Sequence, residues 1–258
     1  MKLKLKNKAS RKILPYTRRK TMKKLILGLL ILLSASMMFG QTLTLDADSG
    51  FYIYMKGSQT KLSEEEYLTY AQGFEKEIYN KYHNDEFEWF DQFQIIKEKC
   101  DKKIEEADLT ATYTVVTTVE FGDYDFTNGG FPISIEEGTF FPLGITSSYY
   151  NCDYYSIFNN KIALSLDKFH EYNFLVFEKD AARTFLQGRK DRYGNIDRTI
   201  TLQITYKIAA FDSAEYKEFE DLALSNNYLP IVGIIESIEV YDTKDQRNIK
   251  KIGTLIKK

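Results

Sequence analysis

The periodicity of the apolar residues changes at Asp108, and this change divides the chain into a helical part and a β-rich part. Before it, apolar residues recur every three or four positions, for example at Tyr67, Ala71 and Phe74, and this spacing gives a helix one apolar face. After it, alternate positions from Tyr113 to Phe121 are separated by mostly polar or small neighbours in a β-branched context, which is typical of a strand. We therefore expect an α+β fold.

Two capping patterns define the helical part. Ser63 is followed three positions later by Glu66, and Asp85 is followed in the same way by Glu88. Each pair has the spacing of a capping box, which satisfies free N–H groups at the start of a helix. We predict two helices, or one kinked helix, over residues 64–107, with Glu-rich and Lys-rich outer faces in solvent.

The residues ahead of these helices predict a β-hairpin. Short alternating runs at 42–45 and 51–55 are separated by the polar segment 46–50, which has the composition of a turn. The predicted organisation is therefore a hairpin with a helical segment at 41–109, followed by a β-rich domain at 110–258.

The β-rich domain is expected to contain several further strands and two short helices. The helices are predicted at 178–187, where Gly188 ends the pattern, and at 213–224. The further strands are predicted at 161–166, 174–177, 198–208, 231–241 and, more weakly patterned, 249–256. This order fits a helical pair packed on an antiparallel sheet over residues 110–256, or a small OB-like Greek-key barrel as the more specific form.

The N-terminus has the composition of a secretory leader. Residues 1–40 contain eleven Lys and Arg and no acidic residue, and an apolar run extends from Leu25 to Leu33 before a group of small residues. This order is that of a signal peptide. We expect cleavage near Gly40 and an extracytoplasmic protein, in the periplasm, in the envelope or secreted.

Two alternatives for the leader stay open. Met22, followed by two lysines and the apolar run, would itself begin a complete signal and is an alternative start. The stretch between Lys24 and Asp46 contains 21 uncharged residues, near the length that crosses a bilayer. An uncleaved N-terminal anchor is therefore the alternative to cleavage.

Removal of the leader makes the chain acidic. Subtracting its eleven basic residues from the total of 35 leaves 24 against 37 acidic residues, a net charge of −13. Such a surface repels the phosphates of nucleic acids and of an anionic leaflet. We expect no nucleic-acid partner, and membrane contact only through an uncleaved leader.

The chain has two cysteines, Cys100 and Cys152, and both follow the predicted leader. An oxidising compartment would allow them to form a disulfide. The bridge would close a loop of about 50 residues, which stabilises by roughly 4 kcal/mol in the chain-entropy model. The alternative is two separate buried thiols, because no neighbouring residue indicates a metal-binding or nucleophilic role.

An unusual cluster of tyrosines surrounds Cys152. A tyrosine ring offers a flat apolar face and a polar tip, so such a cluster is suited to stack on a sugar or to anchor a protein partner. The alternative is a loop or edge strand whose rings pack against the helices. The cluster consists of Tyr149, Tyr150, Tyr154 and Tyr155.

Two acidic loops are candidates for calcium, residues 46–50 and residues 123–130 with Asp123 and Asp125. Their alternating oxygen ligands suit this ion. However, Asn128 stands where an EF-hand needs glycine, and the bidentate acid that closes such a loop is missing. Tight turns explain both loops without an ion, and we expect neither a metal nor a cofactor.

The sequence contains no catalytic motif. The only histidines are His83 and His170, and each is expected to be a surface or boundary residue. Zinc-hydrolase, nucleophile-elbow, Cys-x-x-Cys and phosphate-loop patterns do not occur. We therefore expect a non-enzymatic module that binds a protein or a glycan, and the alternative is an exported hydrolase that uses scattered carboxylates.

Overall fold

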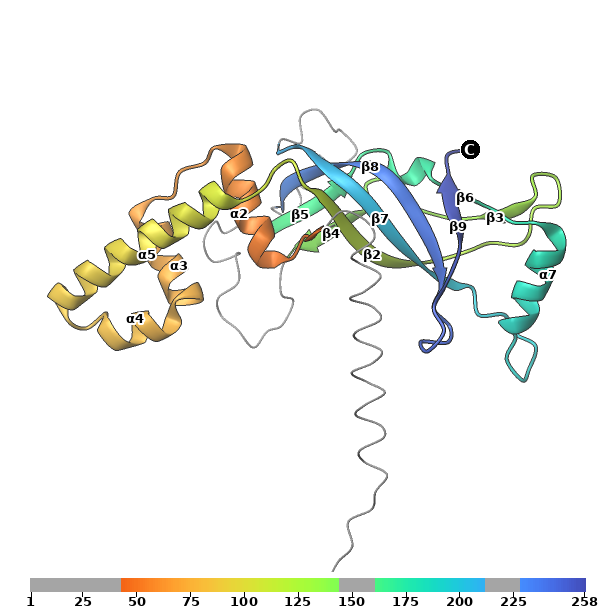
Figure 1. Cartoon of the computed structure of the whole chain (residues 1–258), viewed down its shortest axis with the longest axis horizontal. Helices are drawn as coiled ribbons and strands as arrows, with labels where there is room; N and C mark the ends of the chain where they lie inside the picture. Colours follow the sequence, from red (N-terminus) through yellow and green to blue (C-terminus); the bar gives the residue numbers. More distant parts are fainter. Residues whose placement is uncertain (1–42, 144–160, 212–227) are drawn as a thin grey trace, which may run out of the picture. The chain divides into compact units, whose positions relative to one another are not determined.

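The computed structural model describes residues 43–143, 161–211 and 228–258, which belong to one compact unit, Thr42–Lys258. Helices and strands are both prominent in this unit (Figure 1). In chain order the elements are β1 (Leu43–Thr44), α2 (Ala47–Ser58), α3 (Glu64–Phe74), α4 (Lys76–Tyr82), α5 (Glu86–Glu106), β2 (Thr112–Glu120), β3 (Gly130–Pro132), β4 (Phe140–Leu143), β5 (Lys161–Leu166), η1 (Phe169–Glu171), β6 (Phe174–Val176), α7 (Lys179–Gly188), β7 (Thr199–Ala210), β8 (Tyr228–Asp242) and β9 (Lys250–Ile256).

The described strands form one mixed sheet. Its main order is β1-β2-β7-β8-β9-β6-β3, and β5 joins it by pairing with β8 while β4 pairs with β5. The predicted α+β class is therefore confirmed, whereas the OB-like barrel is not. The prediction of an antiparallel sheet is wrong at two places, because β1 runs parallel to β2 and β5 runs parallel to β8.

The length of β8 allows it to serve two neighbours along one edge. Its residues 228–233 pair with β5 and its residues 239–242 pair with β9, while β7 occupies the other edge. Side chains alternate between the two faces in parallel and antiparallel strands alike. The sequence pattern therefore predicts that these strands exist but gives no information on their direction.

The core lies against one face of the sheet. Ile200, Leu202, Ile204 and Tyr206 alternate along β7, and none of them has exposed surface. Tyr206 lies opposite Tyr113 of β2, with the two ring centroids 6.0 Å apart. Full burial of an aliphatic side chain contributes roughly 2 kcal/mol, so this row of side chains stabilises the centre of the sheet.

Most predicted β elements are confirmed, with shifted ends. The strands predicted at 113–121, 161–166, 174–177, 198–208, 231–241 and 249–256 correspond to β2, β5, β6, β7, β8 and β9. The helix predicted at 178–187 is α7, and the helix predicted at 213–224 lies outside the described residues. β3 and β4 were missed because three and four residues are too few to show an alternating pattern.

The predicted hairpin over residues 42–55 is wrong. Only β1 is a strand there, and the supposed turn and second strand form α2. Asp46 and Ser49 make a capping box, in which the Ser49 N–H donates to Asp46 Oδ1 (2.8 Å) and the Asp46 N–H donates to Ser49 Oγ (2.9 Å). The helix buries Phe51, Ile53 and Met55, a short apolar run whose period is equally compatible with a strand.

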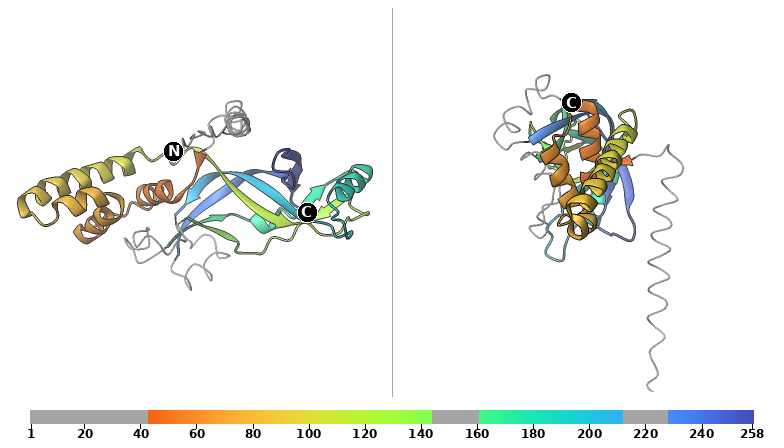
Figure 2. Two further views of the ribbon diagram at one scale, coloured as in Figure 1. Left: turned by 90° about the horizontal axis from the view of Figure 1, so that it is seen from below. Right: turned by 90° about the vertical axis from the view of Figure 1, so that its left-hand side faces the viewer.

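The predicted helical pair over residues 64–107 is made of α3, α4 and α5, which lie side by side (Figure 2). The capping box of Ser63 and Glu66 is confirmed, and the Asp85 side chain accepts from the N–H groups of Phe87 and Glu88. The helical path breaks at Glu75, whose φ of −120° and ψ of 37° are not helical. This break makes three helices where two, or one with a kink, were predicted.

Arg189 joins the end of α7 to β7 and β8, although it is only 1% exposed. Its Nε donates to the Asp197 carbonyl (2.6 Å), its Nη1 donates to Asp242 Oδ1 (2.5 Å) and its Nη2 donates to the Thr199 carbonyl. Its guanidinium lies 5.2 Å from the ring centroid of Phe185. A buried charge needs such partners to offset its loss of hydration.

We predict that Arg189→Met lowers the free energy of unfolding by about 3 kcal/mol or more, because the Asp242 carboxylate loses its buried cation. Urea unfolding of the purified protein measures this loss. The matched control is Arg183→Met on the same helix, whose side chain is 66% exposed. Equal stability of the two variants would show that the Arg189 contacts contribute nothing.

Candidate functional site

An open groove lies where α2, the end of α5 and the strands β1 and β2 meet. Its volume is about 360 Å³, within the range of small-ligand sites. We call it the α2–α5 groove. It is lined by Leu43, Thr44, Asp46, Ser49, Tyr52, Ile53, Lys103, Glu106, Ala107, Asp108 and Tyr113.

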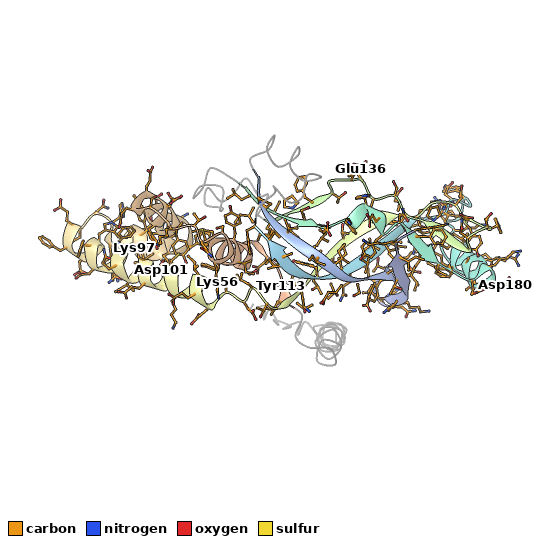
Figure 3. The ribbon with its side chains drawn as sticks, turned by 90° about the horizontal axis from the view of Figure 1, so that it is seen from above. Lys56, Lys97, Asp101, Tyr113, Glu136 and Asp180 are labelled. Carbon is orange, nitrogen blue, oxygen red and sulfur yellow. The ribbon has the colours of Figure 1, made fainter. Side chains whose placement is uncertain are left out.

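Lys56 fixes the two helices that form the groove. Its Nζ donates to the carbonyl of Glu105 (2.8 Å) and to that of Ala107 (2.5 Å), so a cation from α2 lies at the C-terminal end of α5. This is the favourable position for a cation relative to a helix dipole. Figure 3 shows Lys56 and Tyr113 at the junction between the helices and the sheet.

A row of hydrogen bonds leads from the groove into the helical core. Lys103 Nζ donates to the Tyr52 hydroxyl (3.2 Å), and the hydroxyls of Tyr52 and Tyr70 are 2.9 Å apart. Tyr70 is fully buried, and this burial, together with the hydrogen bond to Tyr52, raises the pKa of its phenol. The hydroxyl therefore stays protonated, and the row orients Tyr52 and Lys103 in the groove.

The polar groups of the groove are mainly acidic. Three acidic residues, Asp46, Glu106 and Asp108, line it together with one lysine, Lys103. Lys102 lies 3.7 Å from the exposed Glu106 carboxylate, and Lys56 is the cation near Asp108. Hydrogen bonds from the Thr110 hydroxyl and N–H lower the pKa of Asp108. This carboxylate is therefore ionised at neutral pH, and the groove favours a cationic group.

The floor of the groove is apolar. Ile53 and Tyr113 are each 2% exposed. The Tyr113 hydroxyl donates to the Asp108 carbonyl (2.5 Å), which satisfies its polar tip at the groove wall. An apolar floor with a few charged groups at the rim is the usual composition of a binding site.

Cys100, one half of the predicted disulfide, is a free thiol on α5 with no exposed surface. Burial is the largest cause that raises its pKa, to about 12. Its predicted partner Cys152 lies outside the described residues. The burial of Cys100 agrees with the alternative of two separate buried thiols, as far as this residue is concerned. The pairing with Cys152 stays a prediction.

The two calcium candidates have partners within the protein. The Asp123 carboxylate pairs with Arg198 at 2.5 Å. Asp125 Oδ1 accepts from the N–H groups of Thr127 (2.8 Å) and Asn128 (3.0 Å), and the Asn128 side chain is the largest cause of the lowered pKa of Asp125. These contacts are those of a tight turn. In the described ranges no group of three or more His, Cys, Asp or Glu is placed to hold a metal ion.

The remaining candidate residues are the tyrosine cluster and the two histidines. Tyr149, Tyr150, Tyr154 and Tyr155 lie outside the described residues. The His83 ring stacks on Tyr79 with centroids 4.5 Å apart, between α4 and α5. His170 lies in η1.

The groove residues were missed because they come from segments far apart in the chain. The local signal that points to them is the pair Asp46 and Ser49, which has the capping spacing with Ser in place of the usual Glu or Gln. Recognising it would have placed α2 correctly. It would not have predicted that Lys56 reaches the end of α5.

We predict that Cys100 is inert in the folded protein at pH 8, because its thiol is buried and the thiolate is the reactive form. A chromogenic thiol reagent should modify it at least about a hundredfold more slowly than in urea-unfolded protein. Fast modification of the native protein would contradict the burial. Unfolded protein that yields no thiol until a reductant is added would establish the bridge to Cys152.

Comparison with known proteins gives one similarity. Residues 63–188 match the family model described as "Domain of unknown function (DUF4852)", a range that begins at the Ser63 cap and ends at Gly188. No curated protein and no solved structure matches the chain. Over the three described ranges, no helix has both the length and the apolar character needed to cross a membrane.

Proposed function

We propose that this protein is an exported, non-enzymatic module that binds a protein partner through the α2–α5 groove. The observation that carries this proposal is the combination of an apolar floor at Ile53 and Tyr113 with charged groups at the rim. Binding sites for small ligands and peptide segments share this composition. The row from Lys103 to Tyr70 holds part of the wall in place before a ligand arrives.

The charges of the groove favour a basic segment of the partner. Three acidic residues and one lysine line it, so a lysine or arginine side chain gains more from this site than an acidic or neutral group. Tyr52 adds an aromatic ring to the wall, and the Lys103 ammonium already lies 5.3 Å from the centroid of this ring, in keeping with the attraction of such rings for cations. A glycan would stack on the same ring without using the charges, so the binding test includes a glycan.

The protonation of the carboxylates supports binding over hydrolysis. A general acid needs a raised pKa, as in glycosidases. The carboxylates of the described residues whose pKa departs from the usual value all have a lowered one, caused first by Thr110 at Asp108 and by Asn128 at Asp125. These groups act as hydrogen-bond acceptors that stabilise turns and strand ends.

We predict that a basic tripeptide, Ala-Lys-Ala, perturbs the NMR signals of Tyr52 and Lys103, whereas Ala-Glu-Ala does not, because the groove is acidic. Glu106→Lys should weaken this binding at least about fivefold. The matched control is Glu105→Lys, the neighbouring residue that does not line the groove. Both variants should melt at the same temperature.

Any other outcome of this titration contradicts the protein partner, the role of the groove charges or the groove itself. Perturbation by a neutral trisaccharide and not by Ala-Lys-Ala would replace the protein partner with a glycan. Equal weakening by the two variants would show attraction to the net charge and not to the groove. The absence of any perturbation would overturn the assignment of the groove.

Export has its own test. The leader composition predicts that fractionation of cells finds the protein outside the cytoplasm, and that N-terminal sequencing of the product starts near Gln41. A product that starts at Met1 or Met22 and stays with the membrane would indicate an uncleaved anchor. A full-length soluble product in the cytosol would contradict export while leaving the groove proposal to the titration.

A further inference from the structure

The end of α7 and the turn that joins β8 to β9 lie at the end of the sheet away from α2 (Figure 1). Residues of this turn and Gly188 line a second open pocket. Its volume is about 420 Å³, and it is lined by the cations Lys244, Arg247 and Lys250 together with the Asn248 amide. We call it the basic pocket. Lys244 Nζ donates to the carbonyl of Gly188 (2.9 Å), which ties the turn to α7.

The acidic residues of the basic pocket are already engaged. The Asp242 carboxylate accepts from Arg189 Nη1 (2.5 Å) and from the Lys244 N–H (3.1 Å). Asp245 accepts from the Arg247 N–H (3.0 Å), and its carboxylate lies 3.5 Å from Arg247 Nε, which leaves the two terminal nitrogens of that guanidinium for a ligand. Because Arg189 is buried beside Asp242, its charge offsets that carboxylate from within the protein. The lining cations are therefore only partly neutralised.

The surplus of positive charge extends around the pocket. Residues 183–198 and 242–251 together contain nine basic and four acidic side chains, a net charge of +5. The chain without its leader has a net charge of −13. The other residues of that chain therefore carry a net charge of −18, and these two segments differ from them in the sign of their charge.

We propose that the basic pocket binds the phosphate group of a small phosphorylated molecule. Guanidinium, ammonium and amide N–H groups are the donors that hold phosphate oxygens, and the Arg247 fork suits two of them at once. The acidic remainder of the chain repels an extended polyanion. A nucleic acid or an anionic membrane would meet that remainder, whereas a small ligand would meet the pocket alone.

The test is calorimetric titration of the purified protein with glucose 6-phosphate, inorganic phosphate and glucose, and flotation with phosphatidylglycerol vesicles. Glucose 6-phosphate and phosphate are expected to bind and glucose is not. The double variant Arg247→Gln and Lys250→Gln should weaken phosphate binding at least about tenfold. The matched control, Lys76→Gln with Lys81→Gln on α4, removes the same charge outside both basic segments and should stay within about twofold of the unaltered protein.

Three results would overturn this proposal. The first is equal weakening of phosphate binding by the two double variants, which would show that binding depends on the net charge of the protein and not on the pocket. The second is failure of glucose 6-phosphate and phosphate to bind the unaltered protein. The third is binding to vesicles without binding to either soluble phosphate. Glu106→Lys leaves the pocket intact, so unchanged phosphate binding in that variant keeps this test separate from that of the groove.

Discussion

The pairing of β7 with β8 is the interaction on which the rest of the described structure depends. β2 pairs with one edge of β7, and both β5 and β9 pair with the free edge of β8. The alternate residues of β7 that face the core have no exposed surface, so their burial holds the centre of the sheet. Arg189 binds Thr199 at the start of β7 and Asp242 at the end of β8. One buried guanidinium therefore links the two strands at this end of the pair.

The helical part is held by more local interactions. Three caps, at Asp46, Ser63 and Asp85, set where helices begin. Stacked rings such as Phe51 of α2 and Tyr70 of α3, with centroids 6.0 Å apart, fill the space between helices. Long-range polar contacts position α2: Lys56 bonds the end of α5, and Tyr52 bonds Lys103 of α5 and Tyr70 of α3. The α2–α5 groove exists because these contacts bring α2 and α5 together beside β1 and β2.

What the sequence predicts correctly is local, and what it misses is not. The caps at Ser63 and Asp85 and the alternation in β2 and β7 depend on residues within a few positions of each other, so one chain segment contains the whole signal. Residues 51–55 were assigned to a strand because a short apolar run fits both periods. The parallel pairing of β5 with β8, the contact of Arg189 with Asp242 and the groove join segments 50 or more residues apart, and no pattern within one segment contains them.

The net charge of a chain is a weak guide to its partners when the charges are segregated. The value of −13 without the leader argues against an extended polyanionic partner, yet it is an average over two cavities of opposite character. Three acidic residues and one lysine line the α2–α5 groove, whereas in the basic pocket Asp242 is bound by the buried Arg189 and Asp245 pairs with Arg247. Attraction of a small ligand depends on charges within about a Debye length, roughly 8 Å in physiological salt. A cationic segment and a phosphate can therefore each find a favourable site on the same acidic protein.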